Sequence, residues 1–358
     1  MAQMNTDIVT LLSANGREVS YSYKLLDHAE NERTGINLRV KKCQVRYSSL
    51  DDLKCSATVN MKDDSRIDYE NDRIQIFCNI KVPKIGTFSY SLGIFLMSAP
   101  KRSILSALIN RDVNCYSKLK LLYDKKVDTT YRLSKGANVR NAIISLLGTH
   151  NYILPESNAT MPSNREWQAG STSISIINDL LSDYMGCTSL YVTNEGCFAS
   201  RIYVLPADRT IDFTYTNQSG NLKVNMEEEI DTFSIPNKFT SYTSSSTGES
   251  LYYTYINNNV ESITSVTSRY GRIVSETPVQ VDCSTLAELE KATKKRANEA
   301  SSTYAKITWY TKVIPLHNYL NCCYVANDNV QGKYIETSWV IDSSKGTMEH
   351  NGRKSIAV

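Results

Sequence analysis

Histidine is scarce in this chain of 358 residues, and its four copies show no metal-binding pattern. They are His28, His150, His317 and His350, and no two of them have the spacing of a helical zinc pair. The nine cysteines include no Cys-x-x-Cys pair. There is also no glycine-rich phosphate loop and no G-x-S-x-G elbow. We therefore expect no metal, no cofactor and no catalytic residue.

Long apolar runs are absent as well. No segment approaches the length of a membrane span, and the first ten residues are too polar for a signal peptide. The net charge of +3 is too small to attract nucleic acid or an anionic membrane by bulk electrostatics. The odd number and irregular spacing of the cysteines argue against a disulfide framework. We expect them to be reduced and mostly buried, in a protein made in a cytoplasm.

Alternating apolar residues are abundant in the first hundred positions, and this period of two predicts strands. The expected strands are residues 17–26, 38–47, 53–61, 73–80 and 90–97. Pro100 is expected to end the last of them. Tyrosine, with 23 copies against seven of phenylalanine, suits half-buried strands. Many short strands joined by polar turns indicate a barrel or a sandwich.

The stretch 165–201 organises the middle of the chain. Its apolar residues recur at spacings of three and four, which predicts a helix with one buried face. They are Ile174, Ile176, Ile177, Leu180, Leu181, Tyr184 and Met185. Ser171, Thr172 or Ser173 can cap this helix, and Gly186 can end it. A hairpin of residues 189–192 and 197–203 follows, and further helices are expected over 117–123 and 138–147.

Strands return after residue 200. They are expected at 201–205, 210–215, 305–313, 318–326, 333–342 and 348–358. The Ser/Thr-rich segment 241–250 is interpreted as a loop or hairpin tip. The longest helix is predicted over 285–304, with Leu286 and Leu289 on its apolar side and Ser284 as its cap.

Two sets of residues offer candidate chemistry, each with a simpler interpretation. Glycoside hydrolysis needs two carboxyl groups around one bond, and Glu166 with Asp179 or Asp183 could supply them. The run Glu227–Glu229 is a second source. Solvated surface is the simpler interpretation of these acids, and a core anchor is simpler than a sugar platform for Trp167. A nucleophilic pair of Cys187 with His317 has no local signature, so a buried structural thiol is favoured.

Seven segments spread over most of the chain resemble the tail-hub, or baseplate-hub, proteins of bacteriophages of Gram-positive hosts, including the N-terminal part of tail-associated lysins. They are Leu92–Leu96 with Ser98–Arg102, Tyr116–Val127, Arg165–Gly170, Ile176–Leu181, Arg201–Pro206, Val266–Ile273 and Glu336–Trp339. Each is a packing or turn signature, and their order and spacing carry the resemblance. Its structural core residues are Trp167, Ile177, Leu180, Leu181 and Trp339.

The resemblance implies a β-rich α+β fold similar to the contractile-tail baseplate hub, with two tube-like β-barrel domains plus α+β insert domains. Residues 1–110 would form the first barrel and 111–200 an α+β insert. Residues 201–245 and 304–358 would form the second barrel. Residues 246–303 would be a second insert, carrying the helix 285–304.

The resemblance also implies a structural role in the virion, at the tail tip, after synthesis in the host bacterial cytoplasm. Three subunits would form a ring that joins the hexameric tail tube and distal tail proteins to a spike, fibre or lysin protein. A tape-measure protein is a further expected partner. DNA would pass through without specific binding, so the lumen should lack dense lysine and arginine. The chain ends at Val358, just after the hub pattern, so no lysin activity is carried over.

Two other functions remain open from the sequence. The first is a cell-wall-degrading enzyme of the tail tip that uses carboxylates near Trp167. The second is a receptor-binding protein that recognises host glycans through exposed tyrosine and tryptophan side chains.

Overall fold

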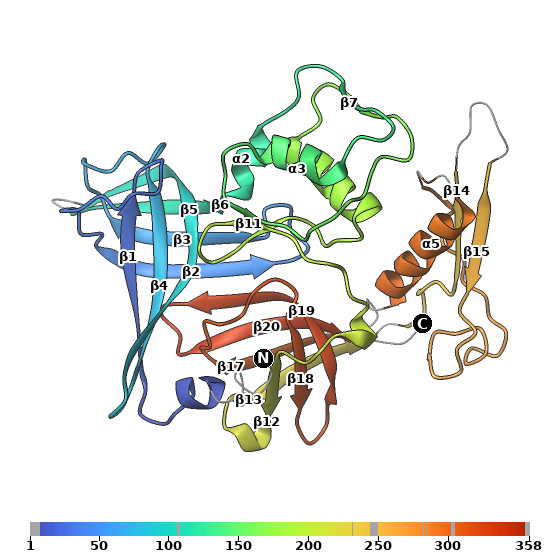
Figure 1. Ribbon diagram of the computed structural model, residues 1–358. Coiled ribbons are helices and arrows are strands. Elements are labelled where there is room, and N and C mark those ends of the chain that lie inside the picture. Colours follow the sequence, from blue (N-terminus) through green and yellow to red (C-terminus); the bar gives the residue numbers. More distant parts are fainter. Residues whose placement is uncertain are drawn as a thin grey trace.

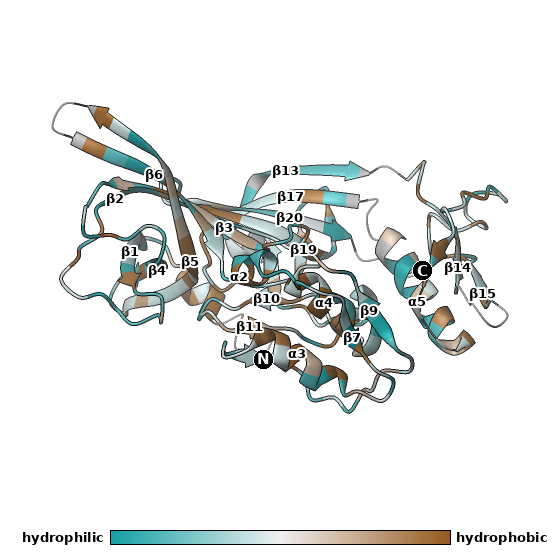
Figure 2. Cartoon of the chain, turned by 90° about the horizontal axis from the view of Figure 1, so that it is seen from above, coloured by the Kyte–Doolittle hydropathy of each residue, from teal (hydrophilic) through white to brown (hydrophobic). Residues whose placement is uncertain are grey.

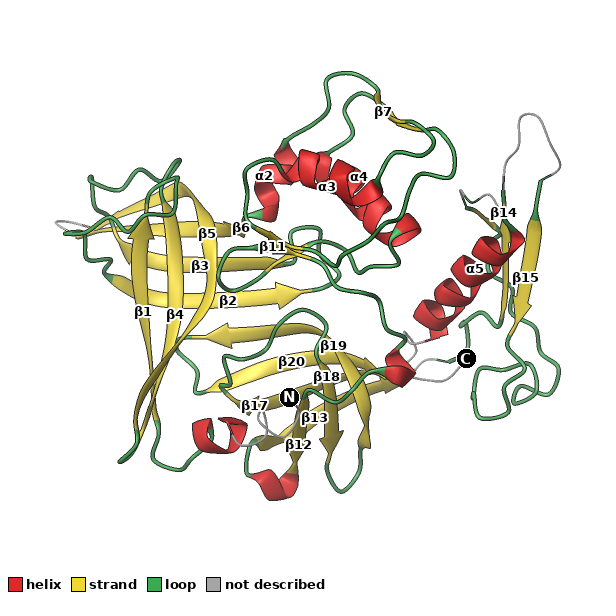
Figure 3. Cartoon of the chain, in the orientation of Figure 1, coloured by secondary structure: helices red, strands yellow, loops and turns green. Residues whose placement is uncertain are grey.

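A single large β-sheet forms the body of the protein (Figures 1 and 3). The computed structural model describes residues 8–105, 108–230, 232–243, 250–281, 283, 285–301 and 305–354. The sheet has twelve strands in the order β1-β4-β5-β6-β3-β2-β19-β20-β17-β13, with β18 joining β12 to β19. With few helices beside it, the sheet confirms the β-rich α+β fold class. Among the described helices, none has the length and apolar character needed to cross a bilayer.

The first half of the sheet follows the predicted alternation closely. Its strands are β1 (Glu18–Leu26), β2 (Val40–Ser48), β3 (Cys55–Lys62), β4 (Arg73–Val82), β5 (Gly86–Leu105) and β6 (Leu108–Ser117). In β4, Ile74, Ile76, Cys78 and Ile80 are all fully buried, because alternate side chains of a strand face the same side. β6 runs across the predicted domain boundary at residue 110, and the division into four domains stays a prediction.

The expected end of a strand at Pro100 is wrong. β5 continues to Leu105, and its pairing with β6 shifts register between Ser98 and Lys101. Proline has no backbone N–H to donate, so it interrupts a regular ladder but is tolerated where a bulge already breaks the pairing. The result is a long hairpin arm that projects beyond the rest of the sheet (Figure 2).

The second half of the sheet comes from distant parts of the chain. Its strands are β12 (Phe213–Thr216), β13 (Leu222–Ile230), β17 (Ala305–Lys312), β18 (Cys322–Ala326), β19 (Gln331–Asp342) and β20 (Thr347–Lys354). Pairing of β2 with β19 joins the two halves, and there Tyr47 lies opposite Trp339. The two rings stack with their centroids 5.6 Å apart, and both side chains are buried. One continuous hydrophobic core runs through both halves.

The strand expected at 201–205 does not form. Only Ile202 makes an isolated bridge, to Cys187. Ile202, Val204 and Leu205 are exposed, so their alternation has no sheet to pack against. A 3₁₀ turn, Pro206–Asp208, follows instead, and another, Asn217–Ser219, lies between β12 and β13.

A small α+β layer lies beside the sheet (Figure 1, green). Its elements are α2 (Leu119–Asp124), β7 (Tyr131–Leu133), α3 (Val139–Leu147), β8 (Tyr152–Ile153), β9 (Arg165–Trp167), α4 (Ser173–Asp179), β10 (Tyr191–Val192) and β11 (Phe198–Ala199). The hydroxyl of Thr172 caps α4 by accepting the amide of Ser175. A π-helical turn, Leu180–Tyr184, extends the helix, and Gly186 then takes a φ of +60°. The predicted helix and hairpin are thus confirmed, with a shorter hairpin.

A separate module lies at one side of the molecule (Figure 1, orange). It consists of β14 (Lys238–Tyr242), β15 (Tyr252–Ile256), β16 (Val279–Gln280) and α5 (Leu286–Ser301). The sequence places β14 at the end of the second barrel, but β14 pairs with β15 and β16. It does so because it forms a hairpin with the strand that follows it; the hairpin tip, residues 244–249, falls outside the described residues.

The longest helix buries Leu289, as the sequence predicts, but not Leu286, which was expected on the same apolar side. Leu289, Thr293 and Ala297 are buried, whereas the residue Leu286 is 51% exposed. Steps of four residues lead from Leu289 to Thr293 and from Thr293 to Ala297, so small residues let the helix lie close to β14 and β15. Ser284, the expected cap, lies outside the described residues. Thr285 and Glu288 form the reciprocal hydrogen bonds of a capping box.

Candidate functional site

A chain of polar side chains crosses the core of the second half of the sheet. Glu336, from β19, accepts a hydrogen bond from Nδ1 of His317 at 2.7 Å and from Nδ1 of His350 at 2.5 Å. The hydroxyl of Tyr215 lies 2.5 Å from Nε2 of His317, and that of Thr311 lies 2.8 Å from Nε2 of His350. All five residues are buried. His317 and His350 are far apart in the sequence, and only the fold brings both to the carboxylate of Glu336.

Burial and the contacts between these side chains shift their pKa values. Burial raises the pKa of Tyr215 well above its usual value, so its hydroxyl keeps its proton and can donate to Nε2 of His317. Burial lowers the pKa of His350 to about 4, so this ring is neutral at pH 7. Burial alone would raise the pKa of Glu336, but the hydrogen bonds and charge interactions with both rings lower it overall. The network is thus a buried carboxylate held by two imidazole N–H groups.

Metal binding is a weaker interpretation of the same cluster. Ligand atoms of His317, Cys323 and Glu336 lie within 4.8 Å of one another. Each His317 nitrogen is already hydrogen-bonded, and burial together with the charge of Glu336 raises the pKa of Cys323 well above its usual value. A metal needs a free imidazole lone pair and a thiolate, so the residues present fit a hydrogen-bonded network better than a metal centre.

The network makes stability depend on pH. In the unfolded chain His350 has an ordinary pKa near 6.5, and in the folded protein its pKa is about 4. Between these values the unfolded chain binds the extra proton, so stability is lost as pH falls through this window. The lowered pKa of Glu336 acts in the same direction at the acid end. We expect a loss on the order of 3 kcal/mol between pH 7 and pH 4 from His350.

Urea unfolding at a series of pH values measures this loss. His350→Gln should flatten the stability profile between pH 6.5 and 4. His28→Gln, which alters an exposed ring, is the control and should leave the profile of the natural protein unchanged. An equal slope in the natural protein and in His350→Gln would show that the acid sensitivity arises elsewhere.

The proposed pair of Cys187 with His317 does not form. Both ring nitrogens of His317 are occupied by Tyr215 and Glu336. Cys187 is buried in the other hydrophobic cluster, beside α4. Burial raises the pKa of its thiol, which opposes nucleophilic reactivity. Among the described residues, no two cysteines form a disulfide.

The carboxylates near Trp167 are held by arginines. Arg165 donates to Asp179 at 3.2 Å and to Asp183 at 2.9 Å, and the indole N–H of Trp167 donates to Asp179 at 2.8 Å. Glu166 points to Arg132, at 3.0 Å. The structure thus joins Asp179 and Asp183 through one arginine and holds Glu166 in a separate ion pair. These contacts fasten β9 to α4, and Trp167 is buried in the same cluster as Ile177, Leu180 and Leu181.

Besides the outer edges of β1 and β12, the outer edge of β13 and the outer part of β5 have no strand partner among the described residues of the large sheet. β13 pairs with β17 alone. From Met97 onward, β5 pairs with β6 alone, since its pairing with β4 ends at Leu96. Figure 2 shows the β5 arm projecting at the upper left of the molecule and β13 near the middle of the view. Unpaired edges present free backbone donors and acceptors, which makes them natural sites for pairing with another chain.

The edges of β5 and β13 carry opposite charge. Glu227, Glu228 and Glu229 follow one another on β13 and are all exposed. Lys101 and Arg102 are exposed on the projecting part of β5. Sequence reasoning noted the acidic run but interpreted it as possible catalytic residues or plain surface. Only the strand order shows that it lies along an open edge of the sheet.

No family model matches the sequence, and no curated protein matches it. The structure is similar to a tail protein from Neisseria meningitidis MC58, with a TM-score of 0.68 at 12% identity over 94% of this chain and 97% of that one. It is similar to a 43 kDa tail protein of prophage MuSo2 from Shewanella oneidensis (TM-score 0.65, 11% identity, 93% and 97% covered). A prophage tail protein from Listeria monocytogenes EGD-e gives 0.58 at 12% identity, with 93% and 94% covered. The chain therefore has the fold of these tail proteins over almost its whole length.

Proposed function

We propose that this protein is a structural hub at the tip of a phage or phage-like tail. The support is a fold shared over nearly the whole chain with three tail proteins from different bacteria. The hydrogen-bonded network around Glu336 is buried in the core, so a substrate has no access to it. A protein whose polar groups hold its own core together is suited to assembly, so we propose further that it acts without catalysis.

The open edges of β5 and β13 carry the proposal that the assembly is a ring. Eight strands, β5-β6-β3-β2-β19-β20-β17-β13, run without interruption from one open edge to the other. Pairing of the basic β5 arm of one copy with the acidic β13 edge of the next would extend this sheet from subunit to subunit. Such a contact joins unlike surfaces and must close to avoid an open filament. Three copies close it in the ring implied by the sequence resemblance.

Within this proposal, one face of the ring meets the tail tube and distal tail proteins, and the other meets a spike, fibre or lysin protein. The channel passes DNA without binding it in a sequence-dependent way. Its location is the virion.

Light scattering of the purified chain over a range of concentrations tests the ring. We expect the mass of a trimer. Lys101→Glu should weaken assembly by roughly tenfold, since like charges then meet across the contact. Glu228→Lys should do the same, and the double variant should restore the trimer, because the opposite charges are exchanged.

Two results would contradict the proposed contact. One is a trimer that neither single substitution weakens. The other is a double variant that is weaker than both single variants. Glu18→Lys, a charge reversal at the far edge strand β1, is the matched control and should leave the mass unchanged. Release of reducing sugar from cell walls by the pure chain, lost in Glu166→Gln, would contradict the non-catalytic role.

A further inference from the structure

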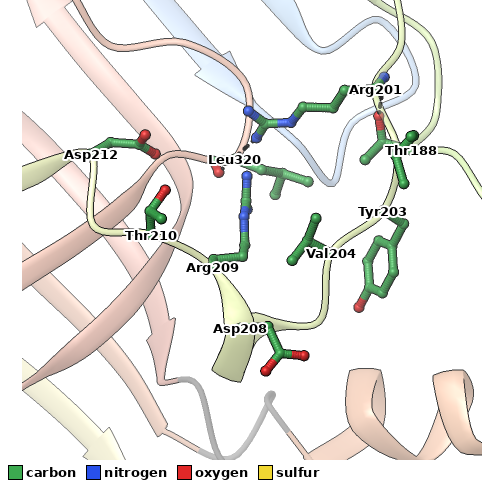
Figure 4. A pocket seen from close by; sticks show the side chains of 10 residues that line it. Thr188, Arg201, Tyr203, Val204, Asp208, Arg209, Thr210, Asp212 and Leu320 are labelled. Atoms are coloured by element: carbon green, nitrogen blue, oxygen red, sulfur yellow. Dashed lines mark hydrogen bonds between the residues drawn. The ribbon is translucent and has the colours of Figure 1, made fainter. Parts of the chain in front are cut away.

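A cavity of about 290 Å³ lies where the segment after β11 crosses the start of β18 (Figure 4). Two arginines, Arg201 and Arg209, contribute to its wall together with Thr188, Tyr203 and Leu320. Figure 4 shows the two guanidinium groups converging beside the carbonyl of Leu320. The cavity lies outside the large sheet's open edges and outside the Glu336 network, so neither of the features described above uses it.

Neither guanidinium has an acidic partner among the described residues. Arg201 donates to the carbonyl oxygens of Tyr319 and Leu320, at 2.5 and 2.9 Å. These acceptors are neutral and leave its positive charge uncompensated. Arg209 makes no ion pair within the described part of the chain, although it is half-buried. Burial and the neighbouring charge of Arg201 both lower the pKa of Arg209, which shows that its charge is held at a cost.

The two nearby carboxylates, those of Asp208 and Asp212, do not act as acidic partners of the two arginines. Asp212 accepts the backbone N–H of Cys322 at 2.8 Å and the side-chain amide of Asn321 at 3.2 Å, so it is engaged with the start of β18. It offsets part of the charge of Arg209 without forming an ion pair with it. Asp208 is exposed, and Figure 4 shows its side chain directed away from the two guanidinium groups. Paired guanidinium groups without an acid are the usual arrangement for holding an oxyanion.

The rim of the cavity identifies the class of oxyanion. Ile202 and Val204 line it, and both are largely exposed, at 63% and 44%. Leu205, the residue after Val204, is exposed as well, and so is Ile211 further along the chain. A free inorganic anion gains nothing from apolar neighbours, whereas a peptide that carries an acidic residue between apolar ones matches both the charged floor and the apolar rim.

We propose that the cavity between Arg201 and Arg209 binds the carboxylate of an acidic side chain presented by an apolar segment of a partner protein. The choice of a protein as the source rests on the proposed assembly role. Each guanidinium donates N–H groups to the incoming carboxylate, and Ile202 and Val204 cover the apolar residues beside it. Because the site lies within one chain, it can be tested without the ring.

Thermal unfolding of the full chain at constant ionic strength tests the site. The probes are acetyl-Leu-Glu-Leu-amide, acetyl-Leu-Gln-Leu-amide and inorganic phosphate. We expect the glutamate peptide, near ten times its Kd, to raise Tm by about 2–4 °C, and the glutamine peptide to have no effect. Arg209→Met keeps the aliphatic stem, so its Tm without peptide should not fall, but the response to the glutamate peptide should vanish.

Arg132→Met is the matched control, because it removes an exposed arginine that is paired with Glu166, and the peptide response should persist. Stabilisation by phosphate with none from the glutamate peptide would overturn the protein source. Equal responses to the two peptides, or a full response in Arg209→Met, would overturn the site. None of these results bears on the mass of the assembly, so failure here and failure of the ring are distinguishable.

Discussion

Leu180→Ala is expected to lower the free energy of unfolding by about 2–5 kcal/mol, as truncations of fully buried leucines do. Leu180 opens the π-helical turn that extends α4, and its side chain has no solvent exposure. It packs in the cluster that includes Trp167, Ile177 and Leu181. Removing three carbon atoms there leaves a cavity between the helix and its neighbours that tight packing cannot easily close. Urea unfolding followed by circular dichroism measures the change.

Leu286→Ala is the matched control, because the same truncation is made on a helix at a position that is 51% exposed. Its effect should stay within about 0.5 kcal/mol. Equal losses for the two variants, or a Leu180→Ala protein that unfolds like the natural one, would mean that the buried face of α4 is assigned wrongly.

Glu336→Ala is expected to cost about 3–5 kcal/mol, the range seen when one partner of a buried charged network is removed. The substitution leaves the Nδ1–H groups of His317 and His350 without an acceptor in a dry core. The ring of His317 cannot turn away from this gap freely, because its Nε2 is hydrogen-bonded to the hydroxyl of Tyr215. Unfolding at pH 7 measures the loss.

Glu336→Gln separates hydrogen bonding from the loss of volume. Glutamine keeps the shape of the side chain, but its amide NH₂ would face one of the imidazole N–H donors, so a loss of roughly 2 kcal/mol should remain. Glu18→Ala, which removes an exposed partner of Lys81, should cost about 0.5 kcal/mol or less. A Glu336→Ala protein as stable as this control would show that the network contributes nothing.

The strands of the first half and the helix at α4 could be predicted from the sequence because their signals are local. Burial on one face of a strand or helix imposes a period of two or of three to four, and β4 and α4 both keep that period along their whole length. Thr172 and the turn at Gly186 set the ends of the helix region by local backbone chemistry. The same reasoning failed at 201–205, where the alternation is present but no neighbouring strand supplies a face to bury it.

The candidate sites depended on contacts that a sequence does not contain. His317, Glu336 and His350 meet because the connection between β17 and β18 lies against β19 and β20, and nothing in their spacing indicates it. Arg201 and Arg209 have recognisable charge, but only the fold shows that no acid among the described residues forms an ion pair with them.

The sequence by itself determined the β-rich character of this protein, the position of most strands and helices, and the packing of the helix after Thr172, because each of these follows from short-range periodicity and capping. The tertiary structure decided the rest. It joined β2 to β19 around Tyr47 and Trp339, continued β5 through Pro100 into an arm, and left β13 as an acidic open edge. The physical reason is that strand order, burial of charge and the pairing of side chains depend on which distant segments share the sheet, and backbone hydrogen bonds carry no sequence code for that choice.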